Sequence, residues 1–139
     1  MTCKTEFDHL NWHDSSITSL EISRLEGKPL RITMQVNYIV SYETVIARTM
    51  SVFFVDPQVL RGNWDGLCLG RDVILTAREI RDSQFKQERR EFLEKIGVRG
   101  NRELFHYEFG LNSGSDIEIV CGGYEMHDIQ NDSMYAYYS

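Results

Sequence analysis

The chain has 139 residues and a mass of 16.2 kDa, enough for one hydrophobic core and too short for a second. Its hydrophobic content of 42% and charged content of 26% are those of a globular protein and exclude a disordered or collagen-like chain. The net charge of −6 argues against a large basic surface for nucleic acid and favours a basic partner. We expect a single domain over residues 1–139 that binds no nucleic acid.

Residues 1–10 do not resemble a secretory signal. Lys4, Glu6 and Asp8 stand where a signal peptide needs a continuous apolar stretch. No later apolar run approaches the length that spans a membrane. These features predict a cytoplasmic protein without membrane association.

The spacing of the three cysteines favours neither a disulfide nor a zinc site, and none of them is expected to be catalytic. Cys3, Cys68 and Cys121 are odd in number and far apart, which fits neither a disulfide framework nor a zinc site built from cysteine pairs. Cys121 ends an apolar run and is expected to be a buried thiol that behaves as a small hydrophobic residue. No cofactor is expected.

The first half of the chain predicts antiparallel strands. Residues 17–22 alternate approximately between apolar and polar and end at a turn-prone segment, 26–29, which indicates a hairpin. Residues 30–39 alternate more strictly, as a half-buried strand does. Residues 45–55 are rich in β-branched and aromatic side chains and predict a third strand, which Asp56-Pro57 ends. The apolar side of the second strand consists of Leu30, Ile32, Met34, Val36 and Tyr38.

The middle of the chain predicts a loop, a strand and a helix. Residues 58–70 contain three glycines and Trp64, which favours an irregular loop. Residues 72–80 are assigned to a short strand, although their second half would also suit a helix. Residues 82–96 have apolar side chains at helical spacing and end at Gly97, a natural helix stop. The apolar positions of this helix are Phe85, Phe92, Leu93 and Ile96.

The last third predicts a second hairpin. Residues 103–109 alternate, residues 112–115 form a turn, and residues 116–121 return as a strand. The tail after Gly123 is too irregular to place beyond a short edge strand. The predicted fold class is α+β: a mainly antiparallel β-sheet, as a sandwich or partly open barrel, with one α-helix near residues 82–96.

Two histidine–aspartate pairs are the most conspicuous polar motifs. His13-Asp14 precedes the first strand and His127-Asp128 lies near the end of the chain. Successive side chains on an extended chain point to opposite faces, so we favour a structural role for the first pair, with Trp12 as an anchor to the core. The alternative is a small-ligand or metal-dependent enzyme that uses His13, Asp14, His106 and His127.

Aromatic and acidic side chains predict a protein-binding surface. Tyrosine and tryptophan bury a large area at small entropic cost, and surrounding carboxylates attract a basic partner. No catalytic residue is assigned under this hypothesis. The candidate contact residues are Asp56, Trp64, Asp65, Tyr107, Glu108 and Asp116.

Three short segments carry a resemblance to a known class. They are Trp12-His13-Asp14-Ser15-Ser16-Ile17, the connection 53–64, and His106-Tyr107 followed by residues 113–120. Together they resemble the β-rich immunity-protein-like domains that accompany bacterial polymorphic and contact-dependent toxins. The resemblance implies a non-enzymatic cytoplasmic protein that binds a cognate toxin and occludes its active site. A further alternative is a structural subunit that self-assembles through the aromatic tail, 134–139, for example as a homodimer.

Overall fold

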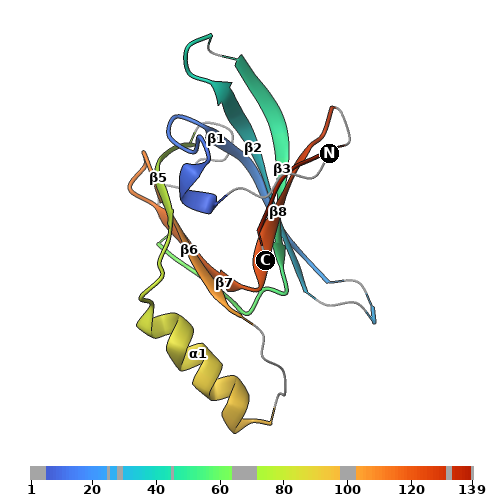
Figure 1. The fold of residues 1–139 in the computed structure, drawn as a ribbon, viewed down its shortest axis with the longest axis vertical. Coiled ribbons are helices and arrows are strands. Elements are labelled where there is room, and N and C mark those ends of the chain that lie inside the picture. Colours follow the sequence, from blue (N-terminus) through green and yellow to red (C-terminus); the bar gives the residue numbers. More distant parts are fainter. Residues whose placement is uncertain are drawn as a thin grey trace.

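The computed structural model describes residues 6–24, 26–27, 30–44, 46–63, 72–97, 103–130 and 133–138. It confirms the α+β class, with a mainly antiparallel sheet and one α-helix in these ranges (Figure 1). The elements are η1 (Phe7–His9), β1 (Ser16–Ser23), β2 (Arg31–Ser41), β3 (Ile46–Val55), β4 (Val59–Arg61), β5 (Asp72–Glu79), α1 (Gln84–Lys95), β6 (Phe105–Leu111), β7 (Asp116–Cys121), β8 (Gly123–Asp128) and β9 (Ser133–Tyr138).

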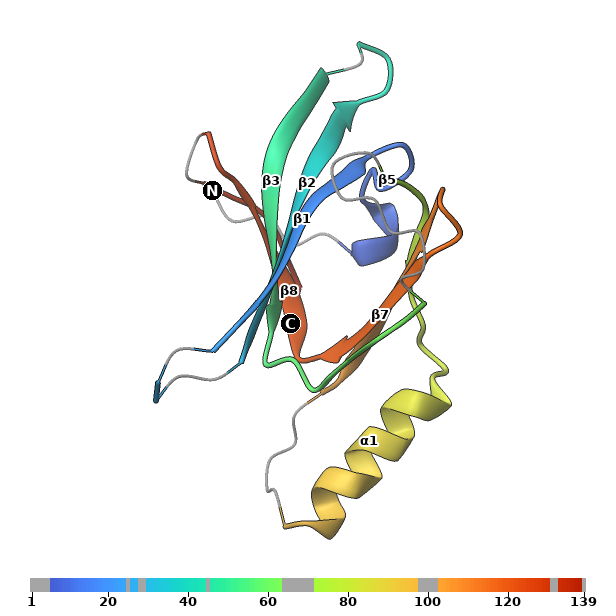
Figure 2. The same cartoon turned by 180° about the vertical axis from the view of Figure 1, so that it is seen from behind.

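The strands form one open sheet that bends into two facing layers. Their order is β4-β7-β6-β5-β1-β2-β3-β8-β9. The first layer contains β1, β2, β3, β8 and β9, and the second layer contains β4, β5, β6 and β7 (Figures 1 and 2). A short pairing of β1 with β5, through Ser16 and Ile17, joins the layers on one side.

Two chain segments cross together between the layers on the other side. β3 continues into β4 after Asp56, and β7 continues into β8 through Gly122. The amide of Gly122 donates to the carbonyl of Val55 at 2.7 Å, and the amide of Gln58 donates to the carbonyl of Val120 at 2.8 Å. A Cβ at position 122 would lie 3.3 Å from the same Val55 oxygen, so glycine permits this close approach.

The core lies between the layers and follows the predicted alternation. On β2, Ile32, Met34, Val36 and Tyr38 are buried as expected, whereas Leu30 precedes the strand and is exposed. β6 contributes Phe105, Tyr107 and Phe109 from the opposite layer. Burial of these large apolar side chains is the main term that stabilises the bent sheet.

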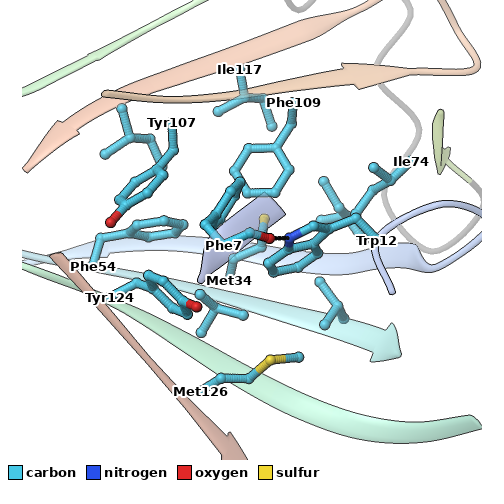
Figure 3. Close-up of a cluster of buried hydrophobic side chains, with 14 of the residues drawn as sticks. Phe7, Trp12, Met34, Phe54, Ile74, Tyr107, Phe109, Ile117, Tyr124 and Met126 are labelled. Atoms are coloured by element: carbon cyan, nitrogen blue, oxygen red, sulfur yellow. Dashed lines mark hydrogen bonds between the residues drawn. The ribbon is translucent and has the colours of Figure 1, made fainter. Parts of the chain in front are cut away.

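The segment before β1 fills the space between the layers (Figure 3). The rings of Phe7 and Trp12 lie 4.9 Å apart, and each contacts Phe109 from the second layer at 5.4 Å. The indole of Trp12 donates a hydrogen bond of 2.8 Å to the carbonyl of Phe7. The prediction that Trp12 anchors this segment to the core is therefore confirmed.

One sequence prediction about strands is wrong, and a second is incomplete. Part of the predicted loop 58–70 is strand β4, which pairs with β7, while residues 64–70 lie outside the described residues. The tail after Gly123 begins with β8, an interior strand between β3 and β9. Its inward side chains, Tyr124 and Met126, are completely buried, but they alternate over too few residues to stand out in the sequence. β9 lies at one end of the sheet, as the predicted edge strand does.

The predicted helix is α1, but it contributes little to the core. Ser83 caps its N-terminus by accepting a hydrogen bond of 2.9 Å from the amide of Lys86. None of its residues is fully buried, and Phe92 and Ile96 are 47% and 57% exposed. Figure 1 shows α1 beyond the ends of β6 and β7. Neither α1 nor η1, the helices of the described ranges, is long and apolar enough to cross a membrane.

Candidate functional site

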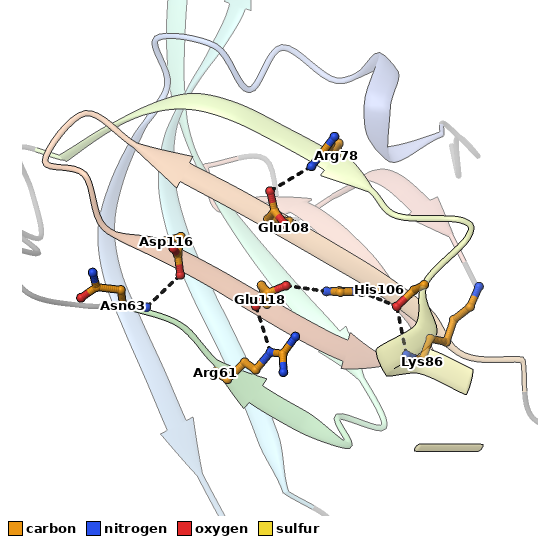
Figure 4. Close-up of polar contacts among 9 residues, drawn as sticks. Arg61, Asn63, Arg78, Lys86, His106, Glu108, Asp116 and Glu118 are labelled. Carbon is orange, nitrogen blue, oxygen red and sulfur yellow. Dashed lines mark hydrogen bonds and ion pairs between the residues drawn. The ribbon is translucent and has the colours of Figure 1, made fainter. Parts of the chain in front are cut away.

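A row of four charged side chains crosses the outer face of the second layer (Figure 4). In register, Arg61 of β4 lies opposite Glu118 of β7, Glu118 opposite Glu108 of β6, and Glu108 opposite Arg78 of β5. The Nε of Arg61 donates to Glu118 Oε2 at 2.9 Å, and Arg78 Nη2 donates to Glu108 Oε1 at 3.4 Å. We call these four residues the charged row.

The two carboxylates at the centre of the charged row are an unfavourable pair. Glu108 and Glu118 occupy directly opposed positions on neighbouring strands, where like charges are destabilising. Each is compensated from the outside by an arginine, so the positive charges lie on the flanks. Both glutamates remain partly accessible to solvent.

Asp116 adds a carboxylate to the same face, along β7. It precedes Glu118 by two positions and lies on the same side of the strand, because side chains alternate. Its Oδ1 accepts from the amide of Asn63 at 2.8 Å, and its own amide donates to the Asn63 carbonyl at 2.8 Å. These bonds hold the carboxylate in place beside the charged row.

A buried hydrogen-bond chain links α1 to the charged row. His106 Nε2 lies 3.1 Å from Glu118 Oε1, and His106 Nδ1 lies 2.6 Å from Ser83 Oγ. An ionised carboxylate only accepts, so neutral His106 carries its proton on Nε2 and accepts from Ser83 at Nδ1. The ring of Phe85 contacts His106 edge to face, and the Arg61 guanidinium lies 3.5 Å from the centroid of that ring.

Ser83, His106 and Glu118 have the residue types of a hydrolase triad, but their arrangement favours a structural role. Ser83 Oγ already accepts the amide of Lys86 and donates to His106, and the residue is buried. A nucleophile needs free access to a substrate carbonyl. We interpret the hydrogen bonds that join Ser83, His106 and Glu118 as a structural link that fixes α1 to the sheet, and we call these three residues the clip. No local sequence signal pairs Ser83 with His106, because the contact spans 23 positions.

Because His106 of the clip is buried, we expect the free energy of unfolding to depend on pH. Burial lowers the pKa of His106 from its ordinary value of 6.5, with Glu118 partly opposing the shift. Between pH 6.5 and the lower pKa of the folded protein, the unfolded chain binds more protons than the folded chain. The stability associated with neutral His106 is therefore fully present above pH 6.5 and is lost as the pH falls toward the lower pKa of the folded protein.

Urea unfolding from about pH 7.5 to about pH 5.5 tests this prediction. The variant His106→Gln should lose less stability on acidification than the wild-type protein. His13→Gln is the matched control, because His13 is exposed, and should keep the wild-type pH dependence. If the free energy of unfolding fell equally with pH in His106→Gln and in the wild-type protein, the role assigned to His106 would be contradicted.

The structure separates the predicted contact residues. Glu108 and Asp116 lie together on the outer face of the second layer, as described above. Tyr107 is 0% exposed and points into the core, so its prediction as a contact residue is wrong. The odd positions of β6 face the core, which places Tyr107 on the buried side of the strand. Asp56 lies at the crossing between β3 and β4, and Trp64 and Asp65 lie outside the described residues.

The residues of the enzyme alternative do not form one site. His13 and Asp14 lie in the turn before β1, where His13 Nδ1 is 3.0 Å from the Leu75 carbonyl. His106 belongs to the clip, and His127 of β8 contacts Glu125 and Phe53. Within the described ranges, no three His, Cys, Asp or Glu side chains gather as a metal site.

Cys121 is a buried thiol, as predicted. It is completely buried, and burial raises the pKa of its thiol to about 12. The nucleophilic thiolate form is therefore negligible near neutral pH.

Comparison with known proteins identifies no relative of this chain. No protein-family model, no curated protein and no solved structure matches it.

Proposed function

We propose that this chain is a non-enzymatic protein-binding domain that contacts a basic partner through the outer face of the second layer. The motifs that resemble immunity-protein-like domains add the expectation that the partner is a cognate toxin. On this proposal the protein acts in the cytoplasm, and binding covers the active site of the toxin.

The observation that carries the proposal is the central pair of the charged row. Glu108 and Glu118 face each other across two strands, and their arginine partners lie only on the flanks. A lysine or arginine of a partner placed between them would relieve their mutual repulsion and form charge-assisted hydrogen bonds. Because Arg61 and Arg78 already restrain the two carboxylates, less side-chain entropy is lost when the partner binds.

The overall charge supports the same choice of partner. The net charge of −6 attracts a basic protein from a distance and accelerates association, an effect that salt screens. Asp116 adds a third carboxylate beside the central pair, held by Asn63. A toxin nuclease with a basic substrate groove would have the complementary charge.

Affinity capture with matched baits tests the proposal. We expect the wild-type protein to retain one basic protein in stoichiometric amount from a lysate of its source organism. The bait Glu108→Gln/Asp116→Asn should retain it at least about tenfold more weakly. Both amides keep an acceptor oxygen for Arg78 and Asn63, so the variant loses charge without losing these bonds.

The control bait carries Glu21→Gln and Glu43→Gln, which remove the same charge at exposed positions away from the face. It should bind the partner as the wild-type protein does, with an association rate only slightly reduced. Equal loss of binding in both baits would indicate a general charge effect and reject this face. Unchanged binding of the Glu108→Gln/Asp116→Asn bait would also reject it.

A further inference from the structure

The exposed flank of α1 carries Phe92 between two charged residues, and a second apolar side chain follows at the C-cap. Glu88, Phe92 and Lys95 are exposed and follow one another at intervals of about one helical turn. Ile96, the C-cap of α1, is also exposed and lies one turn after Phe92. A surface helix of a globular protein normally turns its apolar stripe to the core. Here the body of the protein leaves Phe92 and Ile96 about half exposed, at 47% and 57%.

We propose that this flank binds the same flank of a second copy, in an antiparallel α1–α1′ pair about a twofold axis near Phe92. In an antiparallel pair the N-terminal half of one helix faces the C-terminal half of the other. Glu88 of each copy then lies beside Lys95 of its partner, which makes two equivalent ion pairs. Phe92 packs against its counterpart at the axis, and Ile96 packs beside it.

Charge favours a second copy over the basic partner as the occupant of this flank. The helix carries four basic residues and three acidic ones, in contrast to the chain's net charge of −6. Two copies of an acidic protein would therefore meet here with less repulsion than their net charge implies. The order Glu88, Phe92, Lys95 is self-complementary when the helix is reversed, which is what an isologous contact requires.

The clip holds this flank in a fixed position. Ser83 is bonded to His106, and Arg89 Nη2 donates to Gln58 Oε1 at 3.3 Å. α1 is therefore preorganised before a second copy binds, which lowers the entropic cost of association. A contact of one short helix on each copy is small, so we expect a weak dimer with a dissociation constant of about 1–100 μM.

Sedimentation equilibrium of the full chain tests this inference. We expect the mass to rise with concentration from 16.2 kDa to twice that value. Glu88→Lys places like charges opposite each other twice in the dimer and should weaken it at least about tenfold. Lys95→Glu should have the same effect, and the combined variant Glu88→Lys/Lys95→Glu should restore the dimer, because the pairs are re-formed with reversed charges.

Two results would overturn the proposed contact between the α1 helices. A monomer at all concentrations would overturn the proposal. A dimer that withstands both single reversals would assign the contact to another surface, such as the aromatic tail, and would also overturn it. The inference goes beyond the proposed function and does not depend on it, since Glu108 and Asp116 are unchanged in these variants.

Discussion

Replacement of Phe109 by alanine is expected to lower the free energy of unfolding by about 4 kcal/mol. Phe109 is completely buried on β6, and its ring contacts Phe7, Trp12 and Phe54 at centroid distances of 5.4, 5.4 and 6.3 Å. The truncation removes apolar area and leaves a cavity at the point where the two layers and the segment before β1 meet. Urea denaturation followed by circular dichroism measures the loss.

Phe92→Ala is the matched control for this truncation, because it removes the same atoms from a side chain that is 47% exposed. In dilute solution we expect it to cost less than about 1 kcal/mol, mainly through the lost contact with Arg89. Equal losses for the two variants would show that the facing layers do not form the core. At high concentration Phe92→Ala should instead reduce the mass observed by sedimentation.

Trp12→Ala is expected to cost about 3–5 kcal/mol. The indole is almost completely buried, donates its N–H to Phe7, and contacts Tyr38 from the first layer and Phe109 from the second. Alanine would remove these contacts and leave the Phe7 carbonyl without its indole donor. Thermal and urea unfolding measure the effect.

His13→Ala tests the neighbouring position of the same motif. The His13 imidazole is exposed and makes its bond to the Leu75 carbonyl at the surface, so we expect a loss below about 1 kcal/mol. A large loss for His13→Ala and a small one for Trp12→Ala would reverse the roles assigned here. The expected result makes Trp12-His13-Asp14 an anchored turn rather than a site.

Local patterns predicted the elements whose two faces differ in polarity. The sequence predicts β2 and α1 because alternation and helical spacing extend over many residues. It does not predict β4, which has three residues and lies in a glycine-containing segment, or β8, whose inward apolar side chains are Tyr124 and Met126. β4 pairs with β7, and β8 pairs with β3 as well as with the following strand β9, so each has a partner from a distant part of the chain. Pairing of this kind leaves little local trace in a sequence.

In the candidate site, too, some residues can be predicted from the sequence and others cannot. Charge predicts Glu108 and Asp116 as contact residues, and alternation places them on the outer sides of β6 and β7. Aromatic character predicts Tyr107 as a contact residue, but its position on β6 turns it into the core. Glu118 is absent from the predicted contact residues, although it belongs both to the charged row and to the clip. Its importance depends on cross-strand register, which the sequence does not display.

By itself the sequence determined the α+β class, the α-helix, the hairpins and the buried side of the longest strand, β2, since these depend on the spacing of neighbouring residues. Only the tertiary structure decided that the sheet bends into two layers, that α1 leaves Phe92 and Ile96 exposed, and that Ser83, His106 and Glu118 meet. The physical reason is that register and layer packing are set by contacts between distant segments. Such contacts are selected by the collective burial of the core, which no local stretch of the chain can encode alone.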